Sequence, residues 1–160
     1  MSATELVADL ATRARTAART LSTATGAERK AALEAIAQAL ESRSAEILAA
    51  NEADMVNARA ENMHPQMQDR LLLTAERIKA IAAGAREVAA LPDPLGQILR
   101  KSTLPNGLEL EQISVPFGVI GMVYEARPNV TVDAAVILLM SGNAALLRGS
   151  STARYSNEIL

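Results

Sequence analysis

Residues 115–151 read VPFGVIGMVYEARPNVTVDAAVILLMSGNAALLRGSS, and this stretch decides the fold. It contains two short apolar runs, Val119–Tyr124 and Ala144–Leu147, which flank a longer apolar run, Val130–Met140. Short apolar runs bounded by turn residues are typical of buried strands, whereas a longer run suits a helix. The stretch therefore predicts a strand–helix–strand unit.

The ends of the expected helix are marked in the sequence. Pro128 suits the first helical turn, where its missing N–H costs nothing, and Gly142 and Asn143 are helix stop signals. Two strands joined by a helix should pair in parallel through a right-handed crossover, and such sheets bind ligands at the carboxyl ends of their strands. Here those ends carry the polar loops Tyr124–Asn129 and Arg148–Ser151.

The first half of the chain has a helical composition. Residues 4–92 are rich in Ala, Leu, Glu and Arg, which favour helices, so we expect an all-helical region to about Leu91. Thr25 and Glu28 have the spacing of a capping box. His64-Pro65 marks a break, and Thr74 is placed to cap the last helix of the region.

Residues 93–115 change character and predict a β-hairpin. Asn106-Gly107 lies between two strand-like runs, Gln97–Thr103 and Leu108–Ser114, and this dipeptide favours a tight hairpin turn. A two-stranded ribbon is marginally stable alone in water. The hairpin therefore needs a partner surface, and its own domain is one candidate.

Composition excludes several classes of function. The 160 residues carry a net charge of −2 and only 2% aromatic side chains, so neither nucleic acid nor an anionic membrane is an expected partner. The segment Met1–Leu10 contains Glu5 and Asp9 and lacks the apolar core of a signal peptide, so we expect a cytoplasmic protein. The absence of cysteine excludes a disulfide framework, a thiolate metal site and a cysteine nucleophile within these residues.

The segments Val115–Gly121 and Tyr124–Asp133 resemble the γ-glutamyl phosphate reductase (glutamate-5-semialdehyde dehydrogenase) family of the aldehyde dehydrogenase superfamily. The resemblance covers the whole chain, but only the first part of a family member. Further matching segments are Asn51–Asp54, Asp69-Arg70-Leu71, Asp93–Gln97, Ser141–Ala144 and Leu147–Gly149.

The resemblance implies a truncated α/β fold with three parts. Residues 1–92 would form the helical part of a cofactor-binding domain, 93–115 a hairpin arm for oligomerisation, and 116–160 the first βαβ unit of a Rossmann-like core. The catalytic domain would be absent, and the sequence alone does not say whether the chain is a fragment or a natural truncation. The dinucleotide fingerprint Gly-x-Gly-x-x-Gly is also absent, so only the resemblance points to a nucleotide.

The resemblance also implies an oxidoreductase of proline biosynthesis. The family reduces L-γ-glutamyl 5-phosphate to L-glutamate 5-semialdehyde: a cysteine thiolate displaces phosphate, and hydride from NADPH reduces the resulting thioester. The cysteine should lie beyond Leu160, so we expect this chain alone to be inactive. Expected partners are the small-molecule substrate, a second copy bound through the hairpin, and glutamate 5-kinase.

Site residues follow from the resemblance. Asn129 is the candidate donor to the oxyanion, although an ungapped alignment places Arg127 there instead. Arg148 is the candidate ligand of the NADPH 2′-phosphate, assisted by free N–H groups at a helix capped by Ser150 or Ser151. The full set of candidate cofactor-binding residues is Glu125, Ala126, Arg127, Pro128, Arg148, Gly149, Ser150 and Ser151.

Other interpretations remain open at this stage. Glu125 and Arg127 could form a purely structural ion pair, Arg148 could pair with a carboxylate, and Asp133 would need a partner if it were buried. The whole protein could also reduce another acyl phosphate or an acyl-CoA. A non-catalytic helical interaction module is the remaining class.

Overall fold

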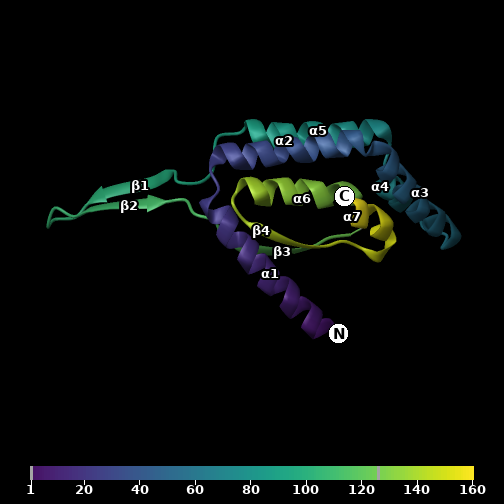
Figure 1. Cartoon of the computed structure of the whole chain (residues 1–160), viewed down its shortest axis with the longest axis horizontal. Helices are drawn as coiled ribbons and strands as arrows, with labels where there is room; N and C mark the ends of the chain where they lie inside the picture. Colours follow the sequence, from purple (N-terminus) through teal and green to yellow (C-terminus); the bar gives the residue numbers. More distant parts are fainter. Residues whose placement is uncertain (1, 126) are drawn as a thin grey trace.

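The structure is a computed structural model that describes residues 2–125 and 127–160. Five helices come first, followed by a hairpin and a strand–helix–strand unit (Figure 1). The helical region ends at Ala90, which confirms the expected limit near Leu91. In chain order the elements are α1 (Ala3–Thr23), α2 (Gly26–Ser42), α3 (Ser44–Ala60), α4 (Pro65–Leu71), α5 (Ala75–Ala90), β1 (Ile98–Thr103), β2 (Glu109–Ile113), β3 (Val119–Val123), α6 (Pro128–Met140), β4 (Ala144–Arg148), η1 (Ser151–Ala153) and α7 (Arg154–Ile159).

Strands β3 and β4 pair in parallel, as the sequence predicts. The register runs from Val119 opposite Ala144 to Val123 opposite Arg148. Helix α6 connects the two strands; it spans Pro128–Met140, and Gly142, two residues after its end, takes the left-handed φ of 72° that favours glycine. The strand–helix–strand prediction is therefore confirmed.

The main core lies between α2, α5 and α6. Helices α2 and α5 run side by side, α6 packs beneath them, and the β3–β4 sheet lies below α6 (Figure 1). Small side chains on the facing surfaces allow the helices to approach closely. The buried residues of this core include Leu33, Ala37 and Leu40 of α2, Ile78, Ala82 and Ala85 of α5, and Val132, Val136 and Met140 of α6.

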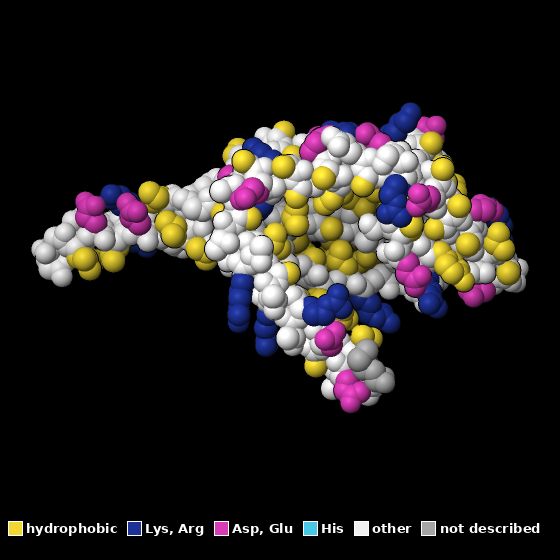
Figure 2. Space-filling view, viewed as in Figure 1, with side chains coloured by type: hydrophobic (Ala, Val, Ile, Leu, Met, Phe, Trp, Pro, Cys, Tyr) yellow, Lys and Arg dark blue, Asp and Glu magenta, His cyan; other side chains and the backbone are white. Residues whose placement is uncertain are grey.

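Helix α1 packs on both β3 and β4 from outside this core. Ala14 and Ala18 of α1 are buried against Ala144 of β4, while Leu6 and Val7 near the helix start are exposed. Apolar side chains also gather on the surface over α6 in the centre of Figure 2. Among the helices that the structure describes, none combines the length and apolar character needed to cross a membrane.

Local helix signals in the sequence were reliable. Thr25 and Glu28 form the expected capping box, in which the Glu28 N–H donates to the Thr25 hydroxyl at 3.2 Å and the Thr25 N–H donates to the Glu28 carboxylate at 2.7 Å. Thr74 likewise caps α5. The sequence reading missed α4, because His64-Pro65 looked only like a break; Pro65 is in fact the first residue of this short helix.

The hairpin of β1 and β2 projects away from the helical body (Figure 1). Asn106-Gly107 makes the predicted turn, with Gly107 at a φ of 83°. Every residue of the two strands is exposed except Ser102, which is half-buried. The structure therefore does not fold the hairpin onto its own domain.

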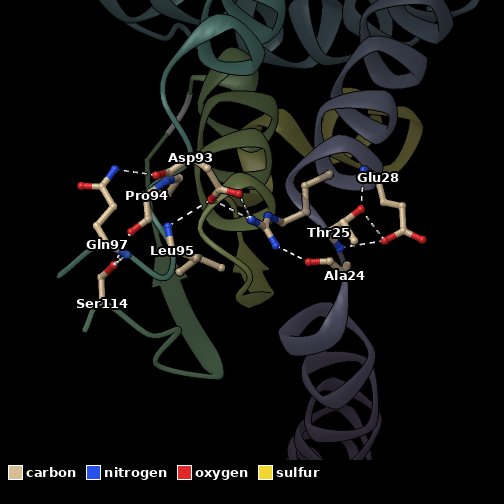
Figure 3. A network of polar contacts seen from close by, with 9 residues as sticks. Ala24, Thr25, Glu28, Asp93, Pro94, Leu95, Gln97 and Ser114 are labelled. Atoms are coloured by element: carbon tan, nitrogen blue, oxygen red, sulfur yellow. Dashed lines mark hydrogen bonds and ion pairs between the residues drawn. The ribbon is translucent and has the colours of Figure 1, made fainter. Parts of the chain in front are cut away.

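A buried arginine joins the α1–α2 junction to the base of the hairpin. Arg29 is 4% exposed and donates to both carboxylate oxygens of Asp93, at 2.7 and 2.6 Å, and to the carbonyl of Ala24. The polar contacts continue from Asp93 to Leu95 and the strand bases (Figure 3). The Leu95 N–H and the Arg29 guanidinium lower the pKa of Asp93.

We predict that Asp93→Asn destabilises the chain by about 1.5–3 kcal/mol, because it leaves a buried guanidinium without its acid. The pKa of Asp93 is lower in the folded state, so its contribution should be complete above the unfolded pKa of about 3.9 and should vanish as the pH falls through the folded value. Urea unfolding followed by circular dichroism, at neutral and acid pH, measures both effects.

The matched control is Asp9→Asn, which removes an exposed ion pair with Arg13 at 3.8 Å. Exposed pairs contribute little to stability, so this variant should unfold like the parent. Equal destabilisation by the two variants would show that the Arg29–Asp93 contact contributes no more to stability than an exposed ion pair.

Candidate functional site

The loops that follow β3 and β4 leave the sheet at one edge, because Val123 pairs with Arg148 in a parallel register. The loop after β3 leads through Glu125 and Arg127 into α6. The other loop leads through Gly149 and Ser150 into η1. The structure thus brings the two sets of candidate residues to the same edge; Ala126 lies outside the described residues.

Three side chains beside this edge of the sheet are joined by hydrogen bonds. The Thr131 hydroxyl donates to the side-chain carbonyl of Asn157 at 2.8 Å, so the Tyr124 hydroxyl, 2.7 Å from Thr131, acts as donor to it. The three residues belong to the end of β3, to α6 and to α7. Sequence reasoning missed Thr131 and Asn157, since no local pattern links positions so far apart.

Gly149 is needed for a close approach within the chain. A methyl group at this position would overlap the side-chain amide of Asn157 and lie 3.1 Å from the ring of Tyr124. Gly149 is also one of the candidate cofactor-binding residues that the resemblance implies. The structure supplies a different reason for the glycine, namely the packing of α7 against the end of β4.

Asp54 of α3 caps the start of α7. Its carboxylate accepts hydrogen bonds from the N–H groups of Tyr155 and Ser156, at 3.1 and 2.8 Å, and from the Ser156 hydroxyl at 2.7 Å. Asp54 is 2% exposed. Ser150 caps η1 by accepting from the N–H of Thr152 at 3.2 Å. These N–H groups are therefore already bonded within the chain.

Asn51, one turn before Asp54, continues the same buried network. Its amide donates to the Leu71 carbonyl at 2.9 Å and to the Ser156 hydroxyl at 3.0 Å, and its oxygen accepts from the Leu73 N–H at 2.7 Å. Asn51 thus fixes the link between α4 and α5 relative to α7.

Arg148 remains the exposed cation at the end of β4. No carboxylate in the described part of the chain forms an ion pair with it, so the structural pairing considered above is not seen. Its backbone carbonyl accepts from the N–H of Tyr124 at 3.1 Å, which ties the two loops together. The guanidinium is available for an anionic ligand.

The polar residues at the start of α6 make contacts along the helix. The Asn129 amide donates to the Asp133 carboxylate at 2.9 Å, and Asp133 is exposed, so it needs no buried partner. Glu125 and Arg127 are linked through the backbone, where the Arg127 N–H donates to the Glu125 carbonyl at 2.7 Å; the described residues show no side-chain ion pair between them. The choice of Arg127 or Asn129 as oxyanion donor stays a prediction.

Two hollows flank the loop after β3. The larger, of about 370 Å³, lies between α4, α5 and the start of α6, and is lined by Arg70, Arg77, Arg127 and Asn129 among others. The smaller, of about 280 Å³, lies at the end of β3 and is lined by Met67, Arg70, Tyr124, Glu125 and Arg127 among others. Arg70 and Arg127 line both hollows.

No family model matches the chain. Curated relatives do: the protein named gamma-glutamyl phosphate reductase from Kineococcus radiotolerans is 53% identical over 156 residues, which cover 98% of this chain and 36% of the relative. The one from Geobacillus thermodenitrificans is 54% identical over 150 residues, covering 94% and 36%. The chain is homologous to the N-terminal portion of γ-glutamyl phosphate reductases.

Solved structures of such reductases have the same fold. The crystal structure of the γ-glutamyl phosphate reductase from Thermotoga maritima superimposes with a TM-score of 0.90 at 39% identity, covering 93% of this chain and 36% of that one. The Saccharomyces cerevisiae enzyme gives 0.89 at 30% identity, covering 99% and 40%. The expected α/β fold of a reductase N-terminal portion is confirmed, and the chain spans only about a third of its relatives' length.

The reductase-like segments upstream of the sheet now have structural roles. Asn51 and Asp54 hold α7, and Asp93 holds Arg29. Asp69-Arg70-Leu71 belongs to α4, where Leu71 is fully buried and Arg70 lines the two hollows. Sequence reasoning recognised these segments by resemblance but assigned no contact to any of them.

We predict that Gly149→Ala destabilises the chain by about 1–3 kcal/mol, the usual effect of overpacking, because the new methyl group displaces Asn157 from Thr131. Asn157→Ala removes the obstructing amide. The double variant should therefore be less destabilised than the sum of the two single variants. Chemical unfolding of the four proteins measures this coupling.

Gly84→Ala is the control, since a methyl group at Gly84 in α5 would meet nothing within 4 Å. It should leave stability unchanged or raise it by up to about 1 kcal/mol, as alanine favours helices. Strictly additive effects at positions 149 and 157 would contradict the proposed packing role of Gly149.

Proposed function

We propose that the whole protein containing this chain reduces L-γ-glutamyl 5-phosphate to L-glutamate 5-semialdehyde and releases phosphate, as a step of proline biosynthesis. The observation that carries the proposal is 53% identity over 98% of the chain to a protein named gamma-glutamyl phosphate reductase. The proposed reductant is NADPH, and the proposed location is the cytoplasm.

The end of β4 fits the proposed cofactor. NADPH supplies hydride when it is bound, and its 2′-phosphate needs a cation. Arg148 is exposed at this edge and lacks an acidic partner among the described residues, so its guanidinium can donate two charge-assisted hydrogen bonds to a phosphate. Arg148, rather than the capped helix start, is therefore the residue that we propose holds the 2′-phosphate.

The start of α6 supports the proposed chemistry at the acyl carbon. The proposed nucleophile is a cysteine thiolate, which these 160 residues do not contain. Charge develops on the carbonyl oxygen when a thiolate attacks, and a preorganised donor stabilises that charge. Arg127 and Asn129, which line the same hollow, remain the candidate donors.

The hairpin supports a homo-oligomer. Exposed apolar side chains on a two-stranded ribbon favour burial against another chain. We propose that a second copy covers this surface in the whole protein. The exposed apolar residues of the arm are Ile98, Leu99, Leu104, Leu108, Leu110 and Ile113.

The 160-residue chain alone should be inactive. Without a thiol it cannot form the thioester, so neither reduction of the acyl phosphate nor phosphate-dependent oxidation of glutamate 5-semialdehyde with NADP should exceed a buffer blank. Absorbance at the NADPH band measures both directions. Turnover that survives repurification would overturn the thiolate mechanism.

Arg148→Ala, made in a full-length version of the enzyme, should weaken NADPH far more than NADH. Losing a hydrogen bond to a charged group costs about 1.5–3 kcal/mol, or roughly tenfold to a hundredfold in affinity. Steady-state kinetics with both cofactors test this directly. An equal fall in kcat/KM for NADPH and NADH would mean that Arg148 does not read the 2′-phosphate.

A further inference from the structure

We propose that Arg70 of α4, together with Arg127, binds the phosphoryl group of the substrate. The inference rests on the proposed function, which makes an acyl phosphate the substrate. It follows from the position, the pairing and the chemistry of the arginines around the loop after β3.

Arg70 and Arg127 line the same two hollows. Arg70 comes from α4 and Arg127 from the loop that enters α6, yet both line the hollow of about 370 Å³ and the neighbouring hollow of about 280 Å³. The two side chains therefore border the same region from two elements. This region adjoins Asn129, and hence the place where the oxyanion donor is proposed.

The three arginines that line the larger hollow differ in whether a carboxylate forms an ion pair with them. Arg77 donates to the Asp69 carboxylate and to the Leu72 carbonyl, both at 2.7 Å, so it is neutralised within the chain. Arg70 has only a weak contact with the Met67 sulfur at 3.9 Å. Within residues 2–125 and 127–160, no carboxylate forms an ion pair with Arg70 or Arg127.

The hollow is therefore electropositive. Three arginines face one aspartate in its lining, which leaves a net positive charge. Part of the wall is apolar, formed by Leu72, Leu73, Ala80 and Ile81. Two unpaired guanidinium groups in such a setting select an anion.

The number of donors favours a phosphoryl group over a carboxylate. A carboxylate is satisfied by the two parallel hydrogen bonds of a single guanidinium fork. A phosphoryl group carries more charge and has enough acceptor oxygens for two forks at once. The pair Arg70 and Arg127 therefore fits the phosphate end of an acyl phosphate, or the inorganic phosphate that leaves it.

The first experiment measures binding of inorganic phosphate to the 160-residue chain by titration calorimetry. Arg70→Gln should weaken binding tenfold or more, and Arg70→Lys should be intermediate, because lysine keeps the charge but loses the fork. Arg15→Gln is the matched control, since Arg15 is exposed on α1 and lines neither hollow. Circular dichroism confirms that each variant is folded.

Two results of this titration would overturn the proposal. One is an equal loss of phosphate affinity in Arg70→Gln and Arg15→Gln, which would indicate a general charge effect. The other is tighter binding of L-glutamate than of phosphate with the same dependence on Arg70, which would make the site a carboxylate site.

The second experiment uses a full-length version of the enzyme in the reverse direction, in which glutamate 5-semialdehyde, phosphate and NADP give γ-glutamyl phosphate, NADPH and a proton. Arg70→Gln should raise the KM for phosphate tenfold or more and leave the KM for NADP unchanged. A parent enzyme without phosphate-dependent oxidation would refute the proposed function itself. An active parent with an unchanged phosphate KM in Arg70→Gln would refute only the role of Arg70.

Discussion

The position of the C-terminal helix α7 depends on one buried carboxylate, that of Asp54. A helix as short as α7, Arg154–Ile159, is not stable on its own, because few hydrogen bonds offset the entropy of ordering it. The carboxylate of Asp54, which belongs to α3, accepts hydrogen bonds from two N–H groups of α7 and from the Ser156 hydroxyl. With α7 held there, Asn157 can reach Thr131 and lie against Gly149, so the loop after β4 is held between the strand and the helix.

A second non-local contact gives the hairpin its direction. Arg29 is buried in the helical body, whereas Asp93 is the first residue of the turn that leads to β1. The Arg29 guanidinium and the Asp93 carboxylate form an ion pair with an N–O distance of 2.6 Å. Gly26 makes room for this contact, because a methyl group there would overlap the Asp93 carboxylate. The hairpin itself has little contact with the body, so the clamp at its base, together with the backbone link from Gly96 to Ser114, sets the angle at which it projects.

Features with a local physical cause could be predicted from the sequence, and those that join distant segments could not. The capping box at Thr25, the helix start at Pro128 and the turn at Asn106-Gly107 are encoded within a few residues. Periodicity carries no information about which carboxylate meets Tyr155, 101 residues away from Asp54. Arg70 was overlooked for the same reason: its helix is too short to show a period, and the hollow beside it exists only once α4, α5 and the loop after β3 are packed together.

The distribution of unpaired cations matches what the proposed reaction requires. Hydride transfer requires the acyl carbon to meet the nicotinamide, which lies at the opposite end of NADPH from the 2′-phosphate. A parallel strand pair offers neighbouring loops about 5 Å apart at the edge of the sheet, which then diverge. One loop follows β4, which ends with Arg148, and the other follows β3 and carries Arg127, which lines the same two hollows as Arg70. Because the loops diverge, Arg148 and the pair Arg70 and Arg127 can each bind one of the two phosphate groups.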